Sequence, residues 1–162
     1  MREVGYHYIV SNGDQTDTVF EHDEYPLYLN AVLGGRKYEP DAPNFTQRIT
    51  AVSSLNKDLP FVQMSILRKS LFGMGCDDLT YRYLLHNSFG RCITTYSGDG
   101  DPLPAFRGDP LLMPLKSGIR EIADTYWAAL NEENRVSLAV KFIEVQGGRS
   151  DIYIINKYTQ IG

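Results

Sequence analysis

Two polar strings near the N-terminus carry the side chains best suited to chemistry. The first is residues 11–18, SNGDQTDT, and the second is residues 37–49, KYEPDAPNFTQRI. Each borders a run of apolar residues, so we expect each on a loop at the end of a core element. A rigid scaffold can hold polar side chains in place on such loops, which therefore often carry function.

The second string offers a pair of carboxylates. Pro40 separates Glu39 from Asp41 and favours an extended conformation at Glu39. In an extended segment residues i and i+2 point to the same side, so both carboxylates can face one pocket. Such a pair can divide acid and base work when the two environments differ. The alternative is a solvated acidic loop.

The first string is read as a turn. Asn12 and Gly13 predict a positive φ angle that bares backbone N–H groups, and Asp14 and Asp17 flank this turn. Acidic residues are common in turns for structural reasons alone, because they bond their own backbone. Arg48, in the second string, either pairs with Glu39 or Asp41 or binds a phosphate or carbonyl of a ligand. Spacing leaves both roles open.

Composition narrows the class of protein. The 162 residues fit one domain, residues 1–162, and are 43% hydrophobic and 22% charged, as in ordinary soluble proteins. A net charge of −4 gives no reason to expect a nucleic-acid partner. No stretch approaches the ~18 apolar residues of a membrane span, and no secretory signal opens the chain. Two cysteines and three histidines show no metal-site spacing, so we expect a cytoplasmic protein without a metal.

Hydrophobic patterning predicts a mixed fold. Strands are expected at residues 4–11, 45–55, 61–67, 91–96, 136–142 and 152–155, and residues 79–85 are ambiguous between helix and strand. Helices are expected at residues 25–33, ended by Gly34 and Gly35, and at residues 119–130. A turn at Gly147 and Gly148 would join the last two strands as a hairpin. The class is α+β, with mostly antiparallel strands and two helices on a sheet face.

The motifs resemble a known family. Residues 12–18 and 38–49 look like the inosine monophosphate cyclohydrolase family of archaeal type. Three later segments are similar to its bacterial branch, namely residues 99–106, 130–138 and 154–157. The resemblance runs through nearly the whole chain, in order.

The resemblance implies a fold and a reaction. The fold would be a four-layer α-β-β-α sandwich similar to the N-terminal-nucleophile hydrolases, without their self-processing chemistry. The reaction would close the purine ring, in which 5-formamidoimidazole-4-carboxamide ribonucleotide loses water to give inosine 5′-monophosphate (IMP). That chemistry requires no cofactor.

The resemblance and the residues together imply a site. Catalytic roles fall on Tyr38, Glu39 and Asp41. Substrate binding falls on the remaining polar residues of the two strings: Asn12, Gly13, Thr16, Asp17, Asn44 and Arg48.

The resemblance also implies an assembly. The chain is similar to the C-terminal two-thirds of the family, whose N-terminal strands and arginine-bearing loop are not matched. We therefore expect a homo-oligomer or a partner chain that supplies that segment, because an uncovered sheet edge tends to pair. The alternative function is a non-catalytic nucleotide-binding or assembly subunit that kept the fold.

Overall fold

The computed structural model describes residues 1–22, 28–56, 58, 60–145 and 149–158. They form two compact units. The first comprises residues 1–86 and 91–112, and the second comprises residues 87–90 with the described part of residues 113–162. The expectation of a single domain stays a prediction.

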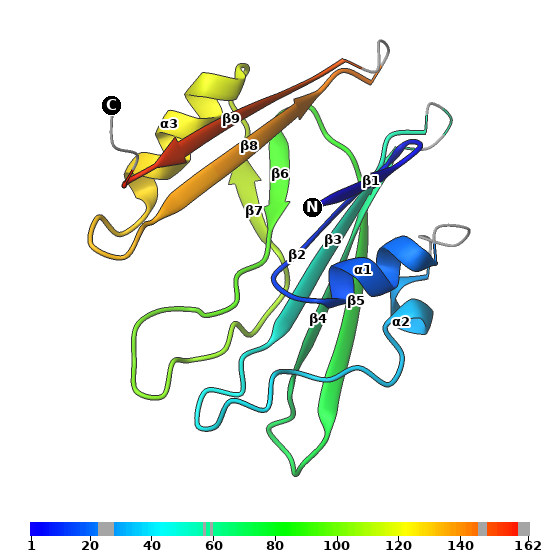
Figure 1. Ribbon diagram of the computed structural model, residues 1–162, viewed down its shortest axis with the longest axis vertical. Helices are drawn as coiled ribbons and strands as arrows, with labels where there is room; N and C mark the ends of the chain where they lie inside the picture. Colours follow the sequence, from blue (N-terminus) through cyan, green and yellow to red (C-terminus); the bar gives the residue numbers. More distant parts are fainter. Residues whose placement is uncertain (23–27, 57, 59, 146–148, 159–162) are drawn as a thin grey trace. The chain divides into compact units, whose positions relative to one another are not determined.

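A five-stranded antiparallel sheet forms the first unit (Figure 1). Its strands lie side by side in chain order: β1 (Arg2–Val4), β2 (His7–Ser11), β3 (Arg48–Ser54), β4 (Phe61–Lys69) and β5 (Cys76–Leu84). Side chains alternate between the two faces of such a sheet. Ile9 on β2 and Val52 on β3 are direct partners and share one face, whereas Val10 and Ala51 share the other.

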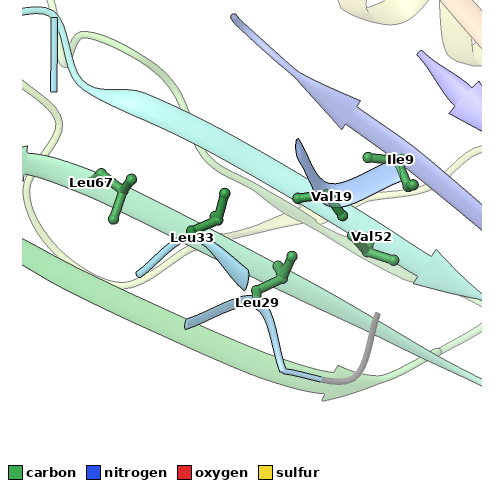
Figure 2. Packing of buried hydrophobic residues seen from close by; sticks show 6 residues of the cluster. All are labelled: Ile9, Val19, Leu29, Leu33, Val52 and Leu67. Atoms are coloured by element: carbon green, nitrogen blue, oxygen red, sulfur yellow. The ribbon is translucent and has the colours of Figure 1, made fainter. Parts of the chain in front are cut away.

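Two short helices cover the face that carries Ile9 and Val52. They are α1 (Gln15–Glu21) and α2 (Leu29–Val32). Figure 2 shows the apolar cluster that joins these helices to the sheet. Its buried members are Ile9, Val19, Leu29, Leu33, Val52 and Leu67. Among the described residues of this unit, no helix packs on the opposite face of the sheet.

Several expectations for the first unit need correction. The single strand at residues 4–11 is wrong, because Gly5, at φ +54°, turns the chain between β1 and β2. Residues 15–21 form a helix that the polar composition of the first string concealed. Of the ambiguous residues 79–85, residues 79–84 belong to a strand, β5 (Cys76–Leu84). In the predicted helix at 25–33, Tyr25 lies outside the described residues, and α2 ends before Gly35, at φ +85°.

The second unit contains a helix and a hairpin. Helix α3 (Ile119–Ala129) packs on the hairpin of β8 (Ser137–Ile143) and β9 (Ser150–Asn156), as the patterning predicts. The turn residues Gly147 and Gly148 lie outside the described residues. Strands β6 (Phe89–Cys92) and β7 (Leu111–Pro114) form a further two-stranded sheet, and each passes from one unit into the other. The strand expected at 91–96 therefore ends at Cys92.

The α+β class with mostly antiparallel strands is confirmed. The four-layer arrangement stays a prediction. Within the described part of the chain, no helix combines the length and apolar character needed to cross a bilayer.

Candidate functional site

Strand register brings the two polar strings together. Strand β2 ends at Ser11 and β3 begins at Arg48, and Ser11 lies opposite Thr50 in the antiparallel pair. The Asn12 backbone N–H then donates to the Ile49 carbonyl at 3.3 Å. The start of the first string and the start of β3 therefore lie side by side.

The Asn12 side chain fastens this junction. Its Nδ2 group donates to the Gln47 carbonyl at 2.9 Å and to Thr95 Oγ1 at 3.3 Å. Its Oδ1 atom accepts from the Ile49 N–H at 2.9 Å and from Gln15 Nε2 at 3.1 Å. These four bonds use both donors and both lone pairs of the amide. Asn12 therefore positions its neighbours and has no spare hydrogen-bonding group for a ligand.

Gln15 is a central residue that the sequence analysis missed. It is completely buried and its Nε2 group donates to Asn12 and to the Ile49 carbonyl, at 3.2 Å. Its Oε1 atom accepts from Arg48 Nη1 at 2.8 Å. Gln15 and Val19 are four residues apart on the buried face of α1, so recognising that helix would have placed Gln15 inward.

Arg48 joins the two strings by charge. Its side chain is 15% exposed and forms ion pairs with Asp14 and, at 2.8 Å, with Glu39. Asp14 also binds Arg36 at 3.0 Å. Hydrogen bonds from Arg36 and Arg48 lower the pKa of Asp14 below its ordinary value. Of the two roles left open for Arg48, the structure contains the pairing with Glu39.

Gly13 has a different role from the one expected. Neither Asn12 nor Gly13 has a positive φ angle, so that prediction is wrong. Instead, a Cβ atom at Gly13 would lie 2.6 Å from Gln15 Oε1 and 2.9 Å from Arg48 Nη1. A side chain at this position would have to displace the end of Gln15 or Arg48 from the hydrogen bond that joins them.

Asp41 forms hydrogen bonds within the second string. Its carboxylate accepts from the Thr46 N–H at 2.7 Å and from Thr46 Oγ1 at 2.5 Å. These bonds, the side-chain one first, lower the pKa of Asp41. Glu39 lies across the same loop and donates its N–H to the Thr46 carbonyl at 2.7 Å. The structure thus places Glu39 with Arg48 and Asp41 with Thr46.

The tip of the second string holds an unusual backbone conformation. Phe45 has φ +47°, which non-glycine residues seldom adopt and which is frequent at functional sites. Its ring meets the Tyr38 ring edge-on, with centroids 5.8 Å apart. The Lys69 ammonium lies 3.4 Å from the Phe45 centroid, a cation–π contact. Tyr38 is therefore held beside Glu39 by packing.

A segment fifty residues further along the chain docks on the second string. The Tyr96 hydroxyl contacts Thr46 Oγ1 at 2.5 Å, and Gln47 Nε2 donates to the Thr94 carbonyl at 2.7 Å. Asn44 Oδ1 accepts from the Leu103 N–H at 3.0 Å. Asn44 therefore serves as an anchor for this segment.

The remaining predicted binding residues, Thr16 and Asp17, lie on α1 and bond to groups other than Arg48. Thr16 Oγ1 donates to the Gly13 carbonyl at 2.9 Å and contacts Ser11 Oγ. Asp17 pairs with Arg2 of β1 at 2.9 Å and is exposed. The expectation that Thr16 and Asp17 belong to a loop is corrected, since both are helical.

A cavity of about 410 Å³ opens beside Asn12 on the sheet face opposite α1 and α2. Its apolar wall is built from strands β2, β3 and β4 together with one residue that follows β6: Val10, Ile49, Ala51, Met64 and Ile93. Its other lining residues are Ser11, Asn12, Thr50, Arg91 and Cys92. Burial raises the pKa of the Cys92 thiol, which disfavours the nucleophilic thiolate. The volume is within the range of small-molecule sites.

Among the residues that the structure describes, no three His, Cys, Asp or Glu side chains gather as metal ligands. An apolar cavity with a few polar groups in its lining is typical of a site that binds a small molecule.

The family model for IMP cyclohydrolase-like proteins matches residues 1–148, so the chain belongs to the IMP cyclohydrolase-like family. Comparison with curated proteins and with solved structures gives no match.

The junction predicts that Gly13→Ala is costly. The added methyl group must displace Gln15 or Arg48, and overpacking of this kind costs about 1–3 kcal/mol. Urea unfolding measures the change in the free energy of unfolding. Gly98→Ala is the matched control, because a Cβ there meets nothing within 4 Å and Gly98 has no positive φ. Equal free energies of unfolding for the two variants would contradict the prediction that a methyl group at Gly13 displaces Gln15 or Arg48.

Acid should weaken the fold through Asp14 and Asp41. Both folded-state pKa values lie below the ordinary 3.8, so their stabilisation is complete above that value and is lost as pH falls through the folded values. The double variant Asp14→Asn, Asp41→Asn should lose less free energy of unfolding between about pH 5 and pH 3. Asp78→Asn should lose more, because burial raises the pKa of Asp78 and its contribution has the opposite sign. Three identical pH profiles would contradict these assignments.

Proposed function

We propose that the protein is an IMP cyclohydrolase of purine biosynthesis in the cytoplasm. It would close 5-formamidoimidazole-4-carboxamide ribonucleotide to IMP with loss of water. The observation that carries the proposal is the junction of the two strings through Asn12, Gln15 and Arg48. Of these three residues, Asn12 lines an apolar cavity. Family membership over residues 1–148 supports the same substrate class.

The chemistry needs orientation and proton transfer. The carboxamide nitrogen loses a proton as it attacks the formyl carbon, and the formyl oxygen gains one and becomes a hydroxyl group. That hydroxyl group then leaves as water with a second proton, while the former formamido nitrogen loses its proton and the ring C=N bond forms. Because both groups belong to one molecule, holding them in the reactive conformation supplies much of the acceleration. A proton acceptor and a proton donor within hydrogen-bond reach of the reacting atoms supply the rest. Tyr38 and Glu39 are not among the residues that line the cavity, and they reach it through Arg48, Gln15 and Asn12.

In this proposal Glu39 accepts the proton and Tyr38 donates one. Glu39 is 38% exposed and its carboxylate is held in position by Arg48. Tyr38 lies next to it and is braced by Phe45. Asp41, engaged by Thr46 and with a lowered pKa, shapes the loop and stays ionised at neutral pH.

The proposed binding residues fall into two groups, those at or bonded to the cavity lining and those that act through local hydrogen bonds. Asn12 lines the cavity, and Arg48 is joined to it through Gln15. Gly13 leaves room for that connection. The others would shape the substrate site through their local bonds: Thr16, Asp17 and Asn44.

The catalytic part is tested with Glu39→Gln. Loss of a general base lowers kcat by about 10²–10⁴-fold. The free energy of unfolding should change by less than about 1 kcal/mol, because the lost ion pair is partly exposed. The assay follows IMP formation from the formamido nucleotide by absorbance, beside thermal unfolding of the same samples.

Glu132→Gln is the matched control. Glu132 is also an exposed carboxylate paired with an arginine, Arg135, at 3.5 Å, and should keep full activity. Equal kcat in both variants would remove Glu39 from the mechanism. A wild-type protein that binds IMP and never forms it would favour the non-catalytic nucleotide-binding subunit.

The four-layer arrangement and self-association belong to the same proposal. Support for association comes from the turn between β4 and β5, where Phe72 is 92% exposed and Met74 is 91% exposed. Exposed apolar clusters often mark interaction sites. The sedimentation coefficient should rise with concentration, and Phe72→Ser should reduce that rise. A wild-type monomer at every concentration would contradict association.

A further inference from the structure

We propose that Arg91 binds the phosphate group of a ribonucleotide held in the cavity beside Asn12. This inference rests on the proposed function, which requires a 5′-monophosphate substrate but leaves its anion without an assigned cation. The sequence analysis gave that role to Arg48 as one of two alternatives.

Arg48 is occupied by protein groups. It carries Asp14, Gln15 and Glu39 on its two terminal nitrogens and is only 15% exposed. A phosphate at Arg48 would have to replace these partners and would meet two carboxylates. A different cation is therefore required at the cavity.

Arg91 lines the cavity and is positioned by neutral groups. Its Cζ atom lies 4.2 Å from the centroid of the Tyr83 ring. Its Nη1 atom donates to the Pro110 carbonyl at 3.4 Å. Stacking and one hydrogen bond orient the guanidinium and leave most of its five donors free for an anion.

The charge of Arg91 is not neutralised by a carboxylate within the described ranges. Six other arginines there form ion pairs: Arg2, Arg36, Arg48, Arg68, Arg135 and Arg149. A guanidinium without an acidic partner at the edge of an apolar cavity attracts a phosphate, which it can bind in a bidentate geometry.

The cavity wall fits the rest of such a ligand. Val10, Ile49, Ala51 and Met64 provide an apolar surface for a planar heterocycle. Arg91 lines the same cavity, so a ligand with an apolar ring and an anionic group is complementary to it. The ligand class is a purine-type ribonucleoside 5′-monophosphate.

The test compares ligands that differ in the phosphate. Isothermal calorimetry measures binding of IMP, inosine and ribose 5-phosphate to the wild type and to Arg91→Gln. Arg82→Gln is the matched control, because Arg82 also stacks on a ring, 4.0 Å from Phe61, and does not line the cavity. Thermal unfolding checks that each variant is folded, and Arg91→Lys retains the charge without the bidentate geometry.

Arg91→Gln should weaken binding of IMP and ribose 5-phosphate by about ten- to a hundredfold, with inosine unchanged. Arg91→Lys should fall between these values, and Arg82→Gln should bind as the wild type does. Wild-type affinity for IMP should rise as pH increases through the second phosphate ionisation near 6, and Arg91→Gln should flatten that rise.

Two results would overturn the inference, namely unchanged IMP binding in Arg91→Gln or an equal loss for IMP and inosine. The proposed function fails separately. If only ribose 5-phosphate binds, and Arg91→Gln abolishes it, the phosphate site stands and the purine assignment falls. If the wild type binds none of the three ligands, both are wrong.

Discussion

The four hydrogen bonds of the Asn12 side chain are the constraint on which the rest of the first unit's polar edge depends. They join the end of β2 to the start of β3 and reach Thr95. Through Gln15 they also fix the entry to α1. Asn12 itself is exposed, but its bonds reach the backbone at Gln47 and Ile49 and the buried Gln15 side chain, and they hold these neighbours in one geometry. The cavity wall inherits its shape from that junction.

The low exposure of Arg48 explains why charged and polar side chains gather around it. Arg48 is nearly enclosed, and an enclosed guanidinium is tolerated only with partners that compensate for lost water. Asp14, Gln15 and Glu39 provide that compensation. These ion pairs and hydrogen bonds order both polar strings. They also occupy Arg48, which its position in the sequence had suggested as a ligand for an anion. Arg91, stacked on Tyr83, retains that capacity.

The sequence predicted the class of fold and most strands, because alternating apolar residues report burial directly. Prediction from the sequence failed where the apolar pattern is weak or where a contact joins residues far apart in the chain. Helix α1 has only Val19 and Phe20 as strong apolar residues, so its polar first turn was read as a loop. The contact of Tyr96 with Thr46 spans fifty residues and depends on how a later segment docks. No spacing rule within one string reveals such a partner. The nearness of Glu39 to Arg48 was among the alternatives, since both lie in the second string.

The pair Glu39 and Asp41 illustrates why spacing alone does not assign roles. The two carboxylates are separated by one proline, yet one is bound by an arginine and the other by a threonine. A shared proton between the two requires that both face one unpaired space, as in carboxylate dyads. Thr46 instead satisfies Asp41 locally and holds the loop whose backbone also positions Glu39. In the proposed mechanism the two residues therefore have different roles: Asp41 sets the conformation of the loop that carries Glu39, and Glu39 is the residue proposed to accept the proton.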